Sequence, residues 1–211
     1  MVVKSRKQKN AEATRKALLR VSRKLFAERG YANTFTEDVV KRARVTRGAL
    51  YHHFRDKQDL FKAVFHEEEQ KLALKIAQAA AIMPDTWSGF VAGCQAFLDA
   101  CLDPVVRQII LIDGPSVFGV KGHREVEESY YLTGVKKALA AGMDAGVIEI
   151  QPIDPLAHIL LGALNEAALV IANANDEDAA RDEAGAVIAR ILEGLKTAAG
   201  PACPVKSGGA E

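Results

Sequence analysis

Six residues between positions 46 and 52 combine hydrogen-bonding side chains with two residues that have almost no side chain: Thr46, Arg47, Gly48, Ala49, Tyr51 and His52. An arginine fork can donate two hydrogen bonds to O6 and N7 of guanine, and hydroxyl groups bond well to phosphate oxygens. Glycine and alanine would let a backbone approach the floor of a groove. We therefore expect this segment to bind duplex DNA.

Two short helices joined by a tight turn are expected to present these residues. Thr34 precedes Glu37 by three residues, a capping-box spacing that predicts a helix over about residues 35–43. Arg44 and Val45 would form the turn. Thr46 can then cap a second helix with an N-cap hydrogen bond.

The second helix has one inward stripe, because Leu50 and Phe54 are four residues apart. The remaining positions face outward, and we assign them two roles. Base-edge contact is predicted for Thr46, Arg47 and Gly48. Phosphate contact is predicted for Thr34, Tyr51, His52 and Lys57. Lys57 belongs to the first turn of the next helix, where the helix dipole would assist anion binding.

This part of the chain closely resembles the DNA-binding domain of the tetracycline-repressor (TetR) family over about residues 10–65. The resemblance lies in Gly30, Tyr31, Thr34, Glu37, Asp38, Val39, Ala43, Val45, Thr46, Gly48, Leu50, Tyr51, His53, Phe54, Lys57, Leu60 and Phe61. It implies a homodimeric transcriptional regulator that binds operator DNA and releases it when a small effector binds. A repressor that reads a near-palindromic operator is the expected form. The alternative is a constitutive DNA-binding protein without an effector.

Arg44 departs from the family pattern, which usually has glycine at this turn. A left-handed backbone there costs a bulky residue about 1 kcal/mol or more. Either the turn is reshaped, or Arg44 tolerates the strain and offers DNA an additional cation. We favour the second alternative and include Arg44 among the expected DNA contacts.

The charge distribution separates the two halves of the chain, although the formal net charge of the 211 residues is only +1. Residues 1–62 contain 17 Lys and Arg against 6 Asp and Glu, a net charge of +11, and the remainder carries −10. A cationic stretch is usually just a solvated face. Next to a helix-turn-helix pattern it indicates the nucleic-acid face.

Helical periodicity extends along the whole chain, so the expected fold is all-α with about nine helices. The expected domains are a flexible basic arm at 1–9, a helix-turn-helix domain at 10–55 whose first helix Asn10 caps, a connector helix at 56–82, an effector-binding and dimerisation domain at 83–199 and a flexible tail at 200–211. A loop is expected over 116–124. Brief alternation around 147–151 is the exception to the helical pattern.

The C-terminal half combines aromatic residues with isolated polar residues in apolar surroundings. Such a set favours a mostly apolar pocket with a few polar groups, although each polar residue could instead be bonded within the core. The resemblance strengthens the pocket interpretation. The expected ligand-binding residues are Trp87, Phe90, Cys94, Phe97, Asp113, Phe118, Tyr130, His158 and Asn165.

The last two long helices are apolar around much of their circumference and must be covered on several sides. We expect them to pair with the same helices of a second subunit, as in the family's usual four-helix dimer; burial within one chain is the alternative. The expected interface residues are Leu160, Ala163, Leu164, Ala167, Val187, Ile188, Ile191 and Leu195.

Catalysis is not expected, because no nucleophile elbow surrounds Ser116 and no metal-spaced cluster or phosphate-binding glycine loop occurs. No cofactor and no metal are expected. Cys94, Cys101 and Cys203 are expected to be spectator thiols rather than a disulfide framework. The apolar stretch near 159–171 contains Asn165 and Glu166 and falls short of a membrane span. A cytoplasmic protein without membrane contact is therefore expected.

Overall fold

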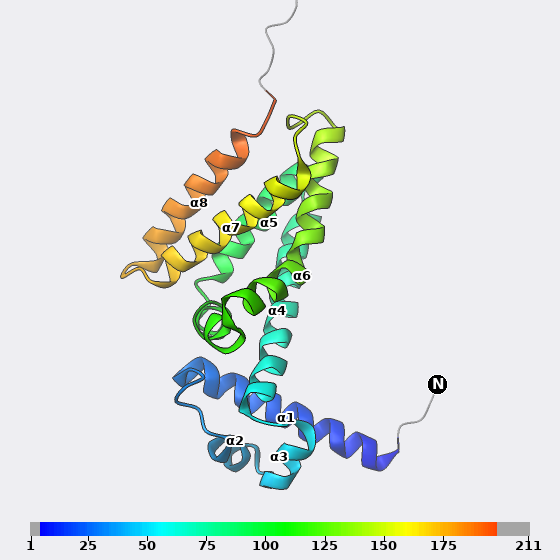
Figure 1. The fold of residues 1–211 in the computed structure, drawn as a ribbon, viewed down its shortest axis with the longest axis vertical. Helices are drawn as coiled ribbons and strands as arrows, with labels where there is room; N and C mark the ends of the chain where they lie inside the picture. The colour runs from blue at the N-terminus through cyan, green and yellow to red at the C-terminus, as the bar shows by residue number, and fades with distance from the viewer. Residues whose placement is uncertain (1–4, 198–211) are drawn as a thin grey trace, which may run out of the picture.

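Helices account for nearly all the regular structure of residues 5–197, the part of the chain that the computed structural model describes (Figure 1). The described residues form eight α-helices and one π-helical segment, η1, and their sole β-type pairing is an isolated bridge between Ile148 and Lys196. The elements are α1 Arg6–Arg29, α2 Thr36–Ala43, α3 Arg47–His53, α4 Lys57–Ala81, α5 Thr86–Ala100, η1 Val106–Asp113, α6 Gly114–Asp144, α7 Ile153–Ala172 and α8 Glu177–Glu193. The all-α prediction is confirmed.

The first helix begins earlier than the sequence suggested. Ser5 is its N-cap, and Ser5 and Gln8 exchange the two hydrogen bonds of a capping box. Asn10 therefore lies inside α1, and residues 6–9 of the expected flexible arm are helical. Residues 1–4 lie outside the described part of the chain.

Helices α1, α2 and α3 form a small bundle at one end of the molecule (Figure 1). Leu18, Leu25 and Phe26 of α1 are fully buried, as is Leu50 of α3, and Phe54 is nearly so. This burial confirms the inward stripe predicted for Leu50 and Phe54. It also leaves the opposite face of α3 free.

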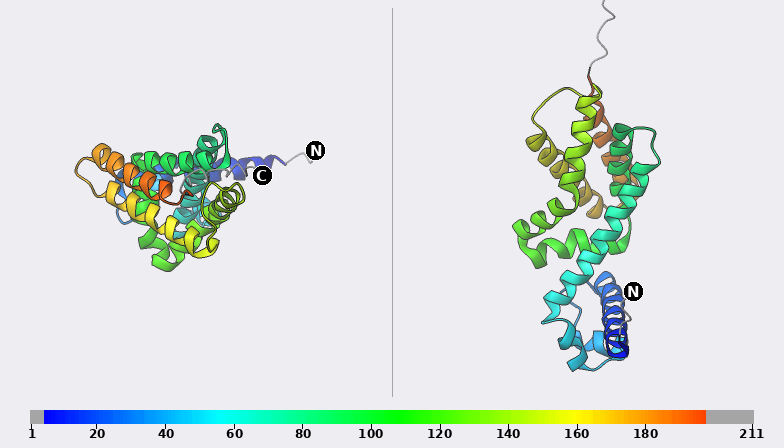
Figure 2. Two further views of the ribbon diagram at one scale, coloured as in Figure 1. Left: turned by 90° about the horizontal axis from the view of Figure 1, so that it is seen from above. Right: turned by 90° about the vertical axis from the view of Figure 1, so that its right-hand side faces the viewer.

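The connector α4 begins at an Asp56 cap, whose carboxylate accepts a hydrogen bond from the N–H of Asp59. It runs from the small bundle into the larger part of the molecule, as the right-hand view of Figure 2 shows. Its N-terminal half contributes Leu60, Phe61 and Phe65 to the core. One rigid element thus spans both parts of the chain.

Close packing of α4 against α5 depends on a glycine. A Cβ at Gly89 would lie 2.9 Å from the carbonyl oxygen of Ala80, closer than such contacts normally allow. The absence of a side chain therefore lets the two helices approach. Asp85 caps α5 by accepting a hydrogen bond from the N–H of Ser88.

The loop expected over 116–124 is wrong, because η1 passes directly into α6 and these residues are mostly helical. Pro115 fits the first turn of a helix, where no intrahelical N–H bond is needed. Gly119 alone leaves the helical conformation, with φ 72° and ψ 157°, and kinks α6. Glycine tolerates this backbone without a Cβ penalty.

The C-terminal helices α7 and α8 are antiparallel neighbours beside α5 and α6 (Figure 1). Asp176 caps α8 as expected, but the helix ends at Glu193 rather than near residue 199. The chain then turns to pair with the segment after α6: Thr197 N–H donates to the Val147 carbonyl, and Glu149 N–H donates to that of Leu195. This pairing explains the brief alternation at 147–151.

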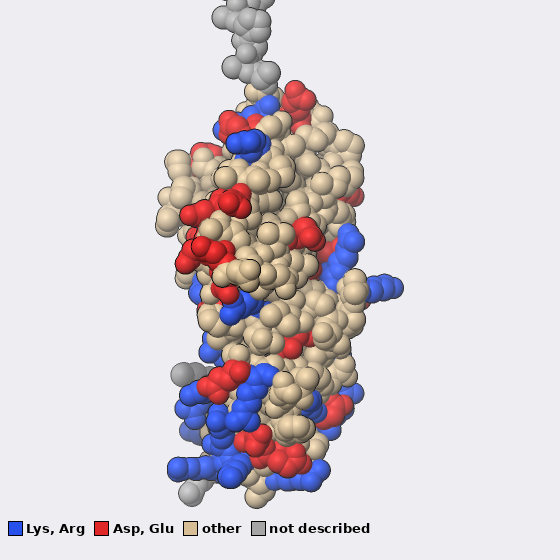
Figure 3. All heavy atoms as spheres, turned by 90° about the vertical axis from the view of Figure 1, so that its left-hand side faces the viewer, with Lys and Arg blue, Asp and Glu red and all other residues tan. Residues whose placement is uncertain are grey.

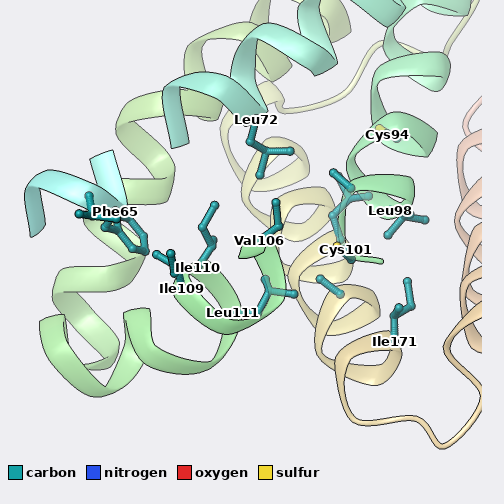
Figure 4. Packing of buried hydrophobic residues seen from close by; sticks show 14 of the residues in the cluster. Phe65, Leu72, Cys94, Leu98, Cys101, Val106, Ile109, Ile110, Leu111 and Ile171 are labelled. Carbon is teal, nitrogen blue, oxygen red and sulfur yellow. The ribbon is translucent and has the colours of Figure 1, made fainter. Parts of the chain in front are cut away.

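The core is continuous from α4 through α5 and η1 to α7, as the labelled side chains in Figure 4 show. Leu72, Leu98, Ile109 and Ile171 are all buried there. Cys94 and Cys101 are also buried, and burial raises the pKa of each thiol to about 12. Both remain free thiols, and Cys203 lies outside the described residues.

One described helix, α7, is long and apolar enough to cross a membrane by length and composition alone. Its buried residues include Leu156, Leu160 and Ile171, which pack in the protein core. Core helices of soluble proteins pass the same test, so this finding is weak evidence for a membrane span.

Candidate DNA-binding face and ligand cavity

The positive charge predicted for the N-terminal part gathers over α1 to α3. Figure 3 shows Lys and Arg side chains concentrated at that end of the visible face, whereas the other end is mainly uncharged and acidic. The exposed cations of this end include Arg15, Lys16, Arg20, Lys41, Arg42, Arg44, Arg47 and Arg55. The surface potential therefore favours a polyanion at this end.

The outward face of α3 is exposed, as a DNA-reading helix requires. Thr46, Arg47, Gly48, Tyr51 and His52 are all exposed, and a Cβ at Gly48 would meet only the Thr46 hydroxyl at 3.9 Å. The Thr46 hydroxyl accepts a hydrogen bond from the N–H of Ala49, so its predicted capping role is confirmed.

Arg47 is held loosely by two neighbours. Its guanidinium lies 3.6 Å from a Glu37 carboxylate oxygen and 5.6 Å from the centre of the Tyr51 ring. An exposed ion pair of this kind contributes about 1 kcal/mol or less. Exchange of this partner for a guanine edge would cost little, so the arrangement leaves Arg47 available.

Thr34 is not available for DNA. Its side chain is 0 % exposed, and its hydroxyl donates to the backbone carbonyls of Gly30 and Leu25 at 2.8 and 3.2 Å. Helix α2 instead begins at Thr36 with Phe35 as N-cap, so the predicted Thr34 cap and phosphate contact are wrong. The residue with a hydroxyl group at the start of α2 is Thr36, which the capping-box spacing does not indicate.

Arg44 adopts the left-handed conformation that the family fills with glycine, at φ 56° and ψ 43°. The turn therefore keeps its left-handed shape, and Arg44 adopts the strained backbone. This result agrees with the second alternative, in which the turn is not reshaped. The side chain is exposed beside α3. It adds a cation to the basic end of the molecule.

Lys57 is more constrained than expected. Its ammonium donates to the Tyr31 carbonyl at 2.9 Å and lies 4.2 Å from the centre of the Tyr31 ring. Burial lowers its pKa, which the nearby Asp113 carboxylate partly opposes. The ammonium has two further protons that could reach a phosphate, but its removal would also loosen Tyr31.

A largely apolar cavity of about 570 Å³ lies between α4, α5, α6 and α7. Five residues of the expected set line it: Phe90, Cys94, Phe97, Tyr130 and Asn165. Its α4 wall consists mainly of alanines spaced along the helix, among them Ala73, Ala77 and Ala80, together with Ile76. No residue of this wall is among the sequence-based expectations, although the repeated alanines on this long helix are a signal of space beside it.

The other four expected ligand residues lie elsewhere. Trp87 is buried beside Phe90 without lining the cavity, and Phe118 packs on Phe65. Asp113 accepts a hydrogen bond from the N–H of Tyr31 at 2.7 Å, between η1 and the N-terminal bundle. His158 lines a second cavity of about 410 Å³. The sequence could not separate these sites, because which residues share a cavity depends on how helices far apart in the chain pack together.

The two cavities share three lining residues, the apolar Leu161 and the polar Tyr131 and Asn165. Tyr131 donates its hydroxyl hydrogen to Glu69 of α4, and the Asn165 amide donates to Glu127 of α6 at 2.9 Å. Burial raises the pKa of both glutamates to about 7. We call Glu69, Glu127, Tyr131 and Asn165 the acidic wall; sequence reasoning identified only Asn165.

The predicted dimer residues divide into two groups. Leu160, Leu164 and Ile188 are buried within the chain, so their assignment to an interface is wrong. Val187 and Ile191 are exposed, and Ala163, Ala167 and Leu195 are partly exposed. Ile159, at 66 % exposure, and Val170 join them, which gives α7 and α8 an uncovered apolar face. We call Ile159, Val170, Val187 and Ile191 the α7–α8 face.

A basic three-helix bundle with an exposed third helix, joined by a long helix to an all-helical part with a cavity, defines a helix-turn-helix transcriptional regulator. Two family models match the chain: the tetR family of bacterial regulatory proteins over residues 18–64 and the tetracyclin repressor-like C-terminal domain over residues 87–195. The chain belongs to the TetR family of transcriptional regulators.

Individual relatives agree with this assignment. A TetR-family regulator from Pectobacterium atrosepticum is 32 % identical, with a TM-score of 0.81 over 92 % of this chain and 99 % of that one. The Transposon Tn10 TetC protein of Escherichia coli is 28 % identical over 65 % of this chain and 69 % of its own length. The regulator AcrR of Shigella flexneri is 41 % identical over 31 % of this chain and 30 % of its own length.

Proposed function

We propose that the protein is a cytoplasmic homodimeric repressor that releases a near-palindromic operator when a small effector enters the cavity. The observation that carries this proposal is that α4 links the two sites. Its first turn holds Lys57 beside the DNA-binding bundle, and its C-terminal half supplies a wall of the 570 Å³ cavity. Among the domains expected from the sequence, we assign DNA binding to residues 10–55 and the connection between the two parts to residues 56–82. Effector binding and dimerisation are assigned to residues 83–199.

For DNA binding, we assign Arg47, Thr46 and Gly48 to base edges. Phosphate contacts go to Tyr51, His52, Lys57 and Arg44, with Thr36 in place of Thr34. One α3 helix of each subunit would enter successive major grooves, so half-sites about 10 bp apart suit a two-fold dimer. Exposure of the whole outer side of α3 supports this arrangement.

For dimerisation, we propose that the α7–α8 face packs on its own copy. Exposed apolar residues on two adjacent helices form a surface that a soluble monomer would rarely leave open. The exposed small residues Gly162 and Ala186 beside it would let helices approach closely. The same surface patch on both subunits meets the requirement of a two-fold interface.

For induction, we propose linkage through α4 and η1. An effector that fits better when α4 is displaced binds the DNA-bound protein more weakly than the free protein. By linkage, binding of the effector lowers the protein's affinity for DNA by the same factor. A hundredfold effect needs about 2.7 kcal/mol of coupling. The bonds of Lys57 and Asp113 to Tyr31 provide a path from the cavity region to the bundle.

The test starts with DNA fragments that the purified protein selects from a random pool. The selected operator should then bind more weakly when a library of metabolites and drugs contains the effector. Arg47→Ala should relax sequence preference and weaken operator binding by about 1 to 3 kcal/mol, whereas Lys57→Ala should weaken all sequences alike and reduce the salt slope by about one.

Lys121→Ala is the matched control, because this exposed cation lies on α6 away from α3. It should change neither sequence preference nor affinity. Equal effects of the Arg47 and Lys57 variants would reject the division of roles. No preference for any oligonucleotide over random competitor would reject operator binding, and no release by any compound would favour the constitutive alternative.

A further inference from the structure

The acidic wall holds two carboxyl groups, that of the buried Glu69 and that of the part-buried Glu127, and neither forms an ion pair with Lys or Arg in the described chain. Glu69 is 0 % exposed, and its Oε2 accepts the hydroxyl hydrogen of Tyr131. Its other oxygen, Oε1, is buried and has no hydrogen-bond partner within the described chain. A buried acceptor without a donor is unfavourable, so this oxygen is able to accept a hydrogen bond from a bound group.

Glu127 has neutral hydrogen-bonding partners, and the cation near it, Arg124, forms its ion pair with Glu128. One oxygen accepts from the Asn165 amide, and the other lies 3.5 Å from Nδ1 of His123. The His123 Nε2 lies 3.0 Å from the Ile110 carbonyl and must carry a hydrogen to bond it, which leaves Nδ1 without one when the ring is neutral. Burial lowers the pKa of His123 and favours this neutral ring.

The acidic wall lies where the two cavities meet, because Tyr131 and Asn165 line both of them and Glu127 lines the second. Glu69 precedes the lining residue Ala73 by one turn of α4, and its partner Tyr131 lines both cavities. Tyr131 and Asn165 direct their hydrogens at the two carboxyl groups. The oxygen atoms of the acidic wall therefore remain as hydrogen-bond acceptors for a ligand. The rest of the large cavity is apolar and aromatic, with Phe90 and Phe97 on α5.

We infer that the effector is an amphipathic cation: its apolar body occupies the 570 Å³ cavity and its ammonium or amidinium group donates to the acidic wall. This inference rests on the proposed effector site and specifies its chemical class. A protonated amine supplies both the donor that Glu69 Oε1 lacks and a charge that attracts the buried Glu69 and the part-buried Glu127. Hydrogen bonds between such ionised partners are the stronger kind.

Two other ligand classes fit less well. An anionic amphiphile would have Lys137 as its one cationic lining residue in this cavity, and that side chain is exposed, where water screens it. A metal ion would need a cluster of ligands, and the described residues contain no group of three or more His, Cys, Asp or Glu able to hold one.

The test uses three probes with the same fluorescent body and different ends: 1-pyrenebutylamine, 1-pyrenebutanol and 1-pyrenebutyrate. Their affinity for the full-length protein is measured by fluorescence titration at pH 7.5. The amine should bind at least about tenfold more tightly than the alcohol, because a hydrogen bond to a charged group contributes about 1.5 to 3 kcal/mol. The carboxylate should bind most weakly.

Glu127→Gln and Glu69→Gln locate the effect, since glutamine still accepts from Asn165 or Tyr131 but carries no charge. Each should weaken the amine about tenfold and leave the alcohol within about threefold of the parent protein. Glu125→Gln is the matched control, because Glu125 is exposed on the same helix and pairs with Lys121. It should leave all three affinities unchanged.

Equal affinities for the three probes, or tightest binding of the carboxylate, would overturn the inference while leaving the cavity as an effector site. Failure of all three probes to bind would reject the effector site together with the inference. The DNA-selection experiment on the same preparation tests operator binding, and its outcome does not depend on the probe titrations. Loss of the cooperative melting transition would show that one of the two glutamate variants does not fold. The other glutamate variant then tests the inference.

Discussion

The carboxylate of Asp113 accepts a hydrogen bond from the backbone N–H of Tyr31, with 2.7 Å between Oδ2 and N. The backbone carbonyl oxygen of Tyr31 accepts a hydrogen bond from the Lys57 ammonium at 2.9 Å. Both backbone groups of Tyr31, in the turn after α1, are thus held by other elements, η1 and α4. Gly30 fits the same junction, where a Cβ would lie 3.1 Å from the Gln108 side-chain amide. This contact joins the DNA-binding bundle to the larger part of the protein.

Removal of the Asp113 carboxylate should loosen that junction. Asp113→Ala leaves the N–H of Tyr31 without its acceptor, so the free energy of unfolding should fall by about 1 to 3 kcal/mol. Urea denaturation measures the change. Asp113→Asn, which keeps an acceptor oxygen, should retain most of the stability. If the two variants are equally stable, the hydrogen bond does not hold the junction.

Replacement of Arg44 by glycine should relieve backbone strain. The left-handed φ of 56° costs a non-glycine residue about 1 to 2 kcal/mol, partly offset by the greater freedom of glycine in the unfolded chain. We expect a modest rise in melting temperature. Operator affinity and its salt dependence are measured on the same variant. If both stay at parental values, Arg44 makes no DNA contact.

The stability of the protein should depend on pH through Glu69. Burial raises the folded-state pKa of this carboxyl to about 7, above its ordinary value of 4.5. The unfolded chain therefore loses the proton first, and the free energy of unfolding is highest below pH 4.5 and falls as pH rises to about 7. Each pKa unit corresponds to about 1.4 kcal/mol, so this contribution reaches about 3 kcal/mol.

Glu69→Gln removes that titration and should become progressively more stable relative to the parent protein as pH rises from 5 to 8. Urea denaturation at fixed protein concentration measures this difference at each pH. Glu125→Gln, which changes an exposed carboxylate, should follow the parent. A stability difference that does not vary with pH would show that Glu69 titrates normally.

A charge on the α7–α8 face should prevent dimerisation. Val187 is 57 % exposed, and Val187→Glu would place two carboxylates in the proposed two-fold interface. We expect sedimentation velocity at micromolar concentration to show a dimer for the parent and a monomer for this variant. Ile150→Glu is the control, because Ile150 is 89 % exposed outside this face. A monomeric parent would contradict the proposed dimer itself.

Much of the DNA-binding bundle follows from short-range patterns. The capping role of Thr46 and the burial of Leu50 and Phe54 depend on residues within one or two helical turns of one another. Thr34 shows the limit of such reasoning, because its spacing to Glu37 fits a capping box equally well. Its hydroxyl instead bonds the carbonyls of Gly30 and Leu25, and only the packing of α1 against the following turn creates that pair of acceptors.

The cavity was predicted only as a class of site. Aromatic and polar residues between positions 87 and 165 indicated a pocket, yet Trp87, Phe118 and Asp113 lie outside it. Glu69 looks in the sequence like a surface residue of an acidic helical turn, next to Glu67 and Glu68. Its burial depends on α6, which places Tyr131 against it.

Residue type, helical period and composition are enough to predict the all-helical class, the helix-turn-helix and the separation of charge. Only the packing of the helices settles which apolar residues of α7 and α8 are buried, which residues line the cavity, and that Glu69 and Glu127 lie near each other without an ion pair to Lys or Arg. These features depend on side chains from helices far apart in the chain, and their burial and pKa values exist only once those helices have packed together.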